Sequence, residues 1–116
     1  MQRKFRLTRS EDFKRVRRSG KSYAHPLVVL IVQTHDQPRV KVGVAAGRTV
    51  GTAVYRNRAK RLLREAMRTL LPNITPGLDL ILIARPGLVS ATLDETRQAL
   101  LTLLQRAKSL IPLNES

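Results

Sequence analysis

The residues best suited to chemistry form one run, 55–68, which reads Tyr-Arg-Asn-Arg-Ala-Lys-Arg-Leu-Leu-Arg-Glu-Ala-Met-Arg. At helical spacing its polar face carries Asn57, Lys60, Arg61, Arg64 and Arg68, with Arg56 and Arg58 at the edges. Like charges four residues apart, such as those of Lys60 and Arg64, each destabilise a helix by roughly 0.2–0.5 kcal/mol. Because only Glu65 offsets this repulsion, the run predicts a surface for an anionic partner, most simply a phosphate backbone.

The charge of the whole chain supports the same interpretation. The 116 residues carry a net charge of +14, from 22 Lys and Arg against 8 Asp and Glu, and most of the basic residues lie at or before Arg68. Such an uneven distribution indicates a positive surface that meets a partner, and the excess of arginine favours bidentate phosphate contacts. A merely solvated basic face is the alternative. An anionic lipid surface fits less well, because the helix needs its apolar side for a core and lacks aromatic anchors.

Residues for catalysis or metal binding are not gathered in the sequence. His25 and His35 are isolated, and the absence of cysteine excludes disulfides and thiolate metal sites. Turn or cap roles explain the acidic residues at predicted element boundaries, which are Asp36, Asp79, Asp94 and Glu95. No phosphate-binding glycine loop is present. The sequence therefore predicts no catalytic residue, no metal and no cofactor in this chain.

The first half of the chain predicts a helix and two strands. A helix over 9–18 would begin at a capping box of Thr8 and Glu11, or at Ser10, and end at Gly20. A strand follows over 22–34, where Pro26 indicates an edge position or a bulge. Valines alternate over 40–45, which predicts a second strand, paired antiparallel with the first. A glycine-bracketed connection then carries Arg48.

The second half predicts the basic helix, one strand and a last helix. The basic helix would begin after Thr52 and reach about Leu71. Its apolar stripe consists of Ala59, Leu62, Leu63, Ala66, Met67 and Leu70. The strand covers 78–84, and a capping box of Thr92 and Glu95 opens a helix that ends at 108–110. Its apolar side consists of Leu93, Leu100, Leu103, Leu104 and Ala107.

The order α-β-β-α-β-α predicts an α+β fold, a two-layer sandwich with a mixed sheet. The last strand, reached through a helix, would run parallel to a neighbour. The length suits a single RNA-binding domain, 1–116, with flexible ends at 1–8 and 111–116. No apolar run is long enough for a membrane span and no secretory signal is visible, so we expect a cytoplasmic protein without a membrane partner.

Residues 42–66 closely resemble the signature of the protein subunit of bacterial ribonuclease P. The core Arg-Asn-Arg-x-Lys-Arg-Leu-x-Arg-Glu, residues 56–65, matches position for position. The flanks are similar too, at Arg6-Leu7, 11–13, 20–22 and 79–86. The resemblance implies a mixed four-stranded sheet like that of ribosomal-protein S5 domain 2 folds, with a left-handed crossover before the basic helix.

The resemblance also implies a function. Members of this family bind a large catalytic RNA and the 5′ leader of precursor tRNA, and the holoenzyme is an endoribonuclease that releases the mature tRNA 5′ end. The RNA carries the chemistry with magnesium, so the protein would need no catalytic residue or cofactor of its own. We expect one protein per RNA. The rival interpretations are a ribosomal or RNA-chaperone protein and an autonomous nuclease that cleaves without added RNA.

Carried over residue by residue, the family pattern assigns two sites. The surface for the catalytic RNA comprises Arg48, Arg56, Asn57, Arg58, Lys60, Arg61, Arg64 and Arg68. The leader would lie in a cleft between the first helix and the sheet, formed with Phe13, Lys14 and Arg17. Arg17 and Ile31 stand where the family has aromatic residues, which implies leader binding through charge more than through stacking.

Overall fold

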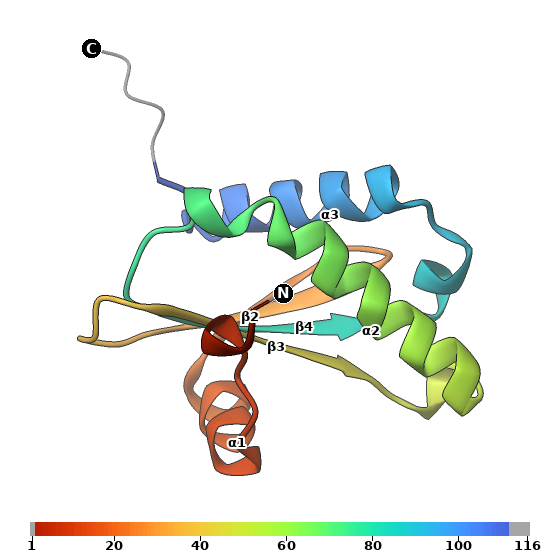
Figure 1. The fold of residues 1–116 in the computed structure, drawn as a ribbon, viewed down its shortest axis with the longest axis horizontal. Helices are drawn as coiled ribbons and strands as arrows, with labels where there is room; N and C mark the ends of the chain where they lie inside the picture. Colours follow the sequence, from red (N-terminus) through yellow and green to blue (C-terminus); the bar gives the residue numbers. More distant parts are fainter. Residues whose placement is uncertain (1, 112–116) are drawn as a thin grey trace.

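A computed structural model describes residues 2–111 of the chain (Figure 1). Its helices and strands are α1 (Ser10–Ser19), β1 (Lys21–Ala24), β2 (Val28–Thr34), β3 (Val40–Ala46), α2 (Ala53–Arg68), β4 (Leu78–Ala84) and α3 (Leu93–Arg106). Short 3-10 helices lie between or before them: η1 (Arg3–Phe5), η2 (Arg48–Val50), η3 (Leu71–Asn73) and η4 (Pro86–Ser90).

The four strands form one mixed sheet in the order β1-β2-β4-β3. Strand β4 pairs antiparallel with β2, where Leu82 lies opposite Leu30, and parallel with β3, where Leu80 lies opposite Val42. The predicted parallel pairing of this strand is confirmed. The predicted antiparallel pairing of residues 40–45 with the preceding strand was wrong, because the apolar β4, buried at nearly every position, takes the central place between them.

The single strand predicted over 22–34 is two strands, β1 and β2, which form an antiparallel hairpin. Pro26 lies in the turn, which is closed by hydrogen bonds from His25 N to Val28 O and from Val28 N to His25 O, at 3.0 and 3.3 Å. Proline cannot donate to a strand ladder, so the chain reverses here instead of continuing through a bulge. The sheet therefore has the four strands that the family resemblance implied.

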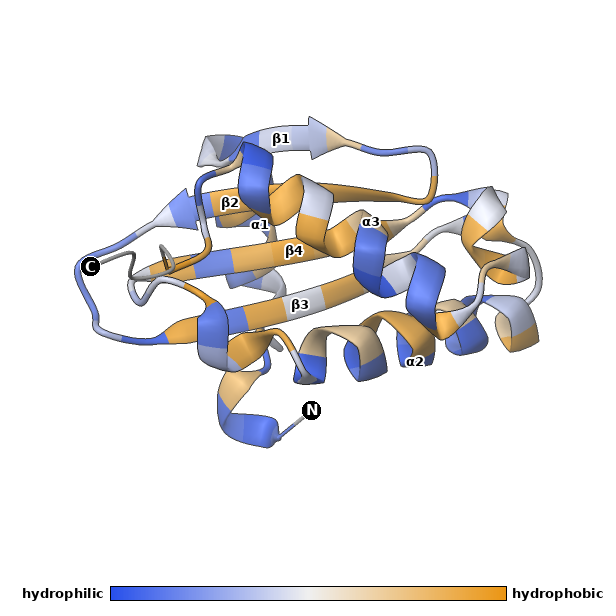
Figure 2. Ribbon diagram, turned by 90° about the horizontal axis from the view of Figure 1, so that it is seen from above, coloured by the Kyte–Doolittle hydropathy of each residue, from blue (hydrophilic) through white to orange (hydrophobic). Residues whose placement is uncertain are grey.

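Helices cover both faces of the sheet. Figure 1 shows α2 and α3 together on one side and α1 on the other. The larger core lies under α2 and α3 and includes Leu30, Leu63 and Leu82, whereas a smaller core under α1 consists of Leu7, Val16, Ile31 and Ile81. Successive residues of β4 point to opposite, covered faces, which explains why every residue of this strand except Asp79 is apolar (Figure 2). The predicted α+β fold with a mixed sheet is confirmed.

The start of α1 differs from the prediction. Arg9 occupies the N-cap position and no side chain caps the helix, so neither the Thr8–Glu11 capping box nor a Ser10 cap forms. Gly20 does end the helix, as predicted. A Cβ atom at Gly20 would lie 2.6 Å from the Val16 carbonyl oxygen, so no larger residue fits there without movement.

The later helices match their predicted starts more closely than their ends. Thr52 precedes α2 but makes no capping hydrogen bond, and α2 ends at Arg68 instead of Leu71. The second capping box is confirmed: Glu95 N donates to Thr92 Oγ1 at 3.0 Å, and Thr92 N donates to Glu95 Oε1 at 2.9 Å. Helix α3 ends at Arg106, and Lys108 just beyond it has a φ of 53°.

The N-terminal segment, residues 2–8, contacts the edge of the sheet. It contains η1, and Leu7 is buried, with its N–H donating to Val42 O at 2.9 Å beside the β3 edge. Residues 112–116, part of the predicted flexible C-terminus, lie outside the described residues. None of the helices between residues 2 and 111 has the length and apolar character needed to span a membrane.

Candidate nucleic-acid interface

The apolar side of α2 fixes which way its basic residues point. Ala59, Leu63, Ala66 and Met67 are fully buried, as the predicted stripe required, and Leu62 is half-buried. Burial of each of the larger side chains stabilises the fold by about 1.5–3 kcal/mol. A rotation of the helix about its axis would expose these side chains and lose that free energy. The basic side of α2 is therefore held outward by the core.

The basic residues of α2 are almost free of acidic partners. Asn57, Arg58, Arg61 and Arg68 are exposed, whereas Arg56, Lys60 and Arg64 are half-buried. Arg68 pairs with Glu65 at 2.7 Å, and this hydrogen bond is the main cause that lowers the pKa of the Glu65 carboxyl. Within the described part of the chain, the other five cations of the helix form no ion pair. No carboxylate among the described residues offsets their mutual repulsion, an arrangement that suits the binding of an anion.

A groove of about 250 Å³ lies beside α2, where the N-terminal segment, α1 and the β3 edge meet. Its lining consists of Arg6, Leu7, Thr8, Phe13, Val42, Gly43, Val44 and Arg64. Burial, followed by the positive charge of Arg6, lowers the pKa of the Arg64 guanidinium from its usual high value. The two arginines are thus close enough to repel each other, and no carboxylate of residues 2–111 lines the groove.

Two buried donors add to this picture. Arg6 Nε and Arg56 Nε are both buried and have no hydrogen-bond partner among the described residues. A buried donor without a partner costs about 1–3 kcal/mol, more when it is charged. The groove, through Arg6, and the first turn of α2, through Arg56, therefore each offer positive charge together with an unused donor, which suits the oxygens of a phosphate.

Phe13 forms one wall of the groove and depends on Gly43. A Cβ atom at Gly43 would lie 2.4 Å from Phe13 Cζ, so the ring lies directly on the backbone of β3. Phe13 also packs against the small core under α1. The ring is therefore both a structural contact and a groove surface, which the sequence alone left open.

The other residues predicted for the leader cleft are placed differently. Lys14 and Arg17 are exposed on α1 and do not line the groove, and Ile31 is buried beneath Val16. Arg48 is exposed in η2. The structure thus joins Phe13 with Arg6 and Arg64. Arg6 is the site residue that sequence reasoning missed, although Arg6-Leu7 had been matched to the family's N-terminal segment.

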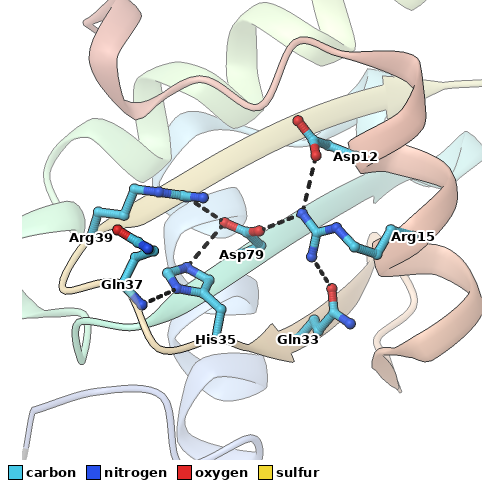
Figure 3. A network of polar contacts seen from close by, with 7 residues as sticks. All are labelled: Asp12, Arg15, Gln33, His35, Gln37, Arg39 and Asp79. Carbon is cyan, nitrogen blue, oxygen red and sulfur yellow. Dashed lines mark hydrogen bonds and ion pairs between the residues drawn. The ribbon is translucent and has the colours of Figure 1, made fainter.

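A separate polar cluster lies at the α1 face of β4 (Figure 3). The Asp79 side chain is 1% exposed and accepts hydrogen bonds from Arg15 Nη2 at 2.8 Å and Arg39 Nη1 at 2.9 Å. His35 Nε2 lies 3.3 Å from the same carboxylate, and Arg15 also contacts Asp12 and Gln33. Burial raises the pKa of Asp79, but the bonds from Arg15 and Arg39 outweigh it, so the net pKa is lowered.

This cluster corrects two predictions. Asp79 is not a turn or cap residue but the second residue of the central strand, and its side chain neutralises arginines from α1 and from the β2–β3 connection. His35 is not isolated, since its Nδ1 accepts from Gln37 N at 3.1 Å while Nε2 faces Asp79. His25 acts within its own turn, accepting from Leu27 N at 3.0 Å. Over residues 2–111 no group of three or more His, Cys, Asp or Glu is arranged to hold a metal ion.

Comparisons with known proteins agree with this architecture. The family model described as Ribonuclease P matches residues 1–108. The ribonuclease P protein component of Herpetosiphon aurantiacus is 44% identical over 93% of this chain and 88% of its own, and that of Brevibacillus brevis is 40% identical over 93% and 86%. A solved mutant of the Staphylococcus aureus RNase P protein superimposes with a TM-score of 0.83 at 27% identity, covering 92% of this chain and 91% of that one.

The family match spans nearly all of the described residues, including the groove, α2 and the Asp79 strand. One family is indicated by three observations: the sequence signature over 42–66, the four-stranded mixed sheet and the similarity to these relatives. The chain belongs to the ribonuclease P protein family.

Proposed function

We propose that this chain is the RNA-binding protein subunit of ribonuclease P, a tRNA-processing endoribonuclease. In this role it binds the catalytic RNA of the holoenzyme and the 5′ leader of precursor tRNA, and it assists removal of the leader. The observation that carries the proposal is the row of cations on α2, five of which form no ion pair among the described residues. They are held outward by a buried apolar face and lie beside a groove that residues 2–111 line with two arginines and no carboxylate.

The catalytic RNA would dock on α2. Its contacts would come from Arg56, Asn57, Arg58, Lys60, Arg61, Arg64 and Arg68. Arg48, in η2, would add a contact next to the N-terminal end of α2. Phosphate contacts of this kind fix position and supply affinity without reading bases. By neutralising phosphates where two RNAs converge, the protein would lower the magnesium concentration that the RNA subunit needs. The chemistry stays on the RNA with its magnesium, and one protein would serve each RNA in the cytoplasm.

The 5′ leader would lie along the groove between α1 and α2. Arg6 and Arg64 offer charge there, Phe13 offers one ring, and Lys14 and Arg17 extend the positive surface along α1. Since Ile31 is buried and Arg17 is not aromatic, stacking surfaces are few. We therefore infer that the leader is held through charge with little base selectivity.

Cleavage of a precursor tRNA at low magnesium tests the proposal. The catalytic RNA alone, the protein alone and both together are compared, and we expect leader removal only with both. Cleavage by the protein alone would make the chain an autonomous nuclease. Binding to RNA without any stimulation would favour a ribosomal or chaperone role, and neither outcome is compatible with the proposal.

The salt dependence of RNA binding is a quantitative prediction. If about six phosphates are contacted, a plot of log affinity against log salt concentration should have a slope of roughly −4 to −5. The measurement is a titration of the catalytic RNA at several potassium concentrations with magnesium held constant. A slope near zero would contradict binding through phosphates.

A further inference from the structure

The first turn of α2 exposes two apolar side chains that the proposed function does not use. Val54 is 75% exposed and Tyr55 is 46% exposed, although both belong to a helix whose apolar residues are otherwise largely buried. Figure 1 shows this turn beside η2, at the opposite end of α2 from η3. The core of the protein therefore does not explain the aromatic residue at this place.

The Tyr55 ring is backed by the protein on one side. Gly51, which has a φ of 131°, lies so close that a Cβ atom there would be 3.1 Å from Tyr55 Cδ2 and 3.3 Å from Tyr55 Cβ. Few residues other than glycine adopt such a backbone conformation, so the contact depends on glycine both for its conformation and for its lack of a side chain. The ring rests on this backbone while nearly half of the residue remains open to solvent.

The surroundings of Tyr55 are positive. Arg48 lies in the adjoining η2, and Arg56 and Arg58 follow Tyr55 in α2. No acidic residue occurs between Gly47 and Arg64, and Glu65, the next one along the chain, already pairs with Arg68. Arg56 also has a buried Nε without a partner among the described residues. An open aromatic ring among arginines complements a nucleic acid, whose bases stack while its phosphates bind the cations.

We propose that Tyr55 is a base-stacking residue, on whose open ring an unpaired base of the catalytic RNA lies while Arg48, Arg56 and Arg58 hold the neighbouring phosphates. The inference rests on the proposed function, since it requires α2 to dock on RNA. It adds a contact of a different kind, because stacking depends on ring area and not on charge.

Substitution of Tyr55 separates stacking from charge. Tyr55→Ala should weaken binding of the catalytic RNA by roughly 5- to 100-fold, as the loss of one stacked base does. The slope of log affinity against log salt should stay unchanged, because stacking releases no counterions. Tyr55→Phe should bind like the parent, and Tyr55→Leu should not restore binding. Tyr23→Ala is the matched control, since Tyr23 lies on β1 at the far edge of the sheet from β3.

A fluorescence measurement tests the contact even if one variant folds poorly. The chain has no tryptophan, so Tyr55→Trp introduces a single indole. Its emission should be quenched when the catalytic RNA is added, while that of Tyr23→Trp should change little. Thermal unfolding of each variant verifies that it is folded.

The outcomes distinguish this inference from the proposed function. If Tyr55→Ala binds the catalytic RNA like the parent while Arg58→Ala binds more weakly, Tyr55 does not stack and the docking of α2 stands. An indole at position 55 that is not quenched would overturn the inference in the same way. If the parent protein does not bind the catalytic RNA at all, both the inference and the proposed function fail.

Discussion

Two pairs of arginines in this molecule have opposite surroundings. Arg15 and Arg39 converge on the buried carboxylate of Asp79, at 2.8 and 2.9 Å. Arg6 and Arg64 meet in a groove that no carboxylate of residues 2–111 lines, and burial together with the charge of Arg6 disfavours the charged form of Arg64. The comparison teaches that a high positive charge has two uses here. One set of cations joins α1 and the β2–β3 connection to the sheet, and the other is the set that we propose for RNA binding.

The largest expected effect comes from removing the carboxylate that binds both Arg15 and Arg39. Asp79→Asn removes the negative charge that Arg15 and Arg39 share, and we expect the free energy of unfolding to fall by about 2–3 kcal/mol. Arg15 and Arg39 keep roughly a third or more of their side chains in solvent, which limits the loss. Urea unfolding measures it. RNA affinity at a temperature where the variant is folded should be nearly that of the parent, and a large loss of affinity would contradict the separation of the two sets.

The pH dependence of stability sharpens the same comparison. The arginines hold the pKa of Asp79 below its usual range in the folded protein. Its contribution to the free energy of unfolding is therefore complete above the unfolded pKa, about 4, and is lost as the pH falls through the lower folded pKa. At pH values below about 4, the urea concentration at the unfolding midpoint of the parent should decrease. The difference in stability between the parent and Asp79→Asn should shrink in the same pH range. A difference that stays constant down to pH 2 would show that the carboxylate charge is not what stabilises the cluster.

The smallest effect on stability is expected in the groove. Arg64→Ala removes a cation that is repelled by Arg6, so the free energy of unfolding should change by no more than about 0.5 kcal/mol. The expected direction is a small increase in stability. Binding of the catalytic RNA should weaken, and the salt slope should decrease in magnitude by about one. Lys108→Ala, at an exposed position just beyond α3, removes one charge elsewhere and is the control. A clear loss of stability in Arg64→Ala would show that this arginine has an internal partner.

Local patterns in the sequence were sufficient for some of these features. The 3.6-residue spacing of the apolar stripe located the buried face of α2, and with it the direction of the basic face. The capping box of Thr92 and Glu95 was readable because its partners are three residues apart. In both cases the interacting residues are close along the chain, so composition and spacing determine the result.

Contacts between distant residues could not be read in this way. The pairing of β3 with β4 and the bond from Arg15 to Asp79 join residues far apart in the sequence, and no local pattern specifies which strand lies beside which. Asp79 resembled a boundary residue because a carboxylate near a turn is common. Arg6 was missed as a groove residue for the same reason, since only the bridge between Arg6 and Val42 brings it beside Arg64.

The central place of β4 has a consequence for the order in which the protein acquires its structure during synthesis. Both β2 and β3 pair with β4 and not with each other, and β4 begins only at Leu78. A growing chain that has not yet released this segment from the ribosome carries a β1–β2 hairpin with one edge of β2 unpaired, a β3 segment without its neighbouring strand, and an N-terminal helix without the Asp79 carboxylate that binds Arg15. More than two-thirds of the polypeptide must therefore be made before the sheet can close, and closure then organises both faces together.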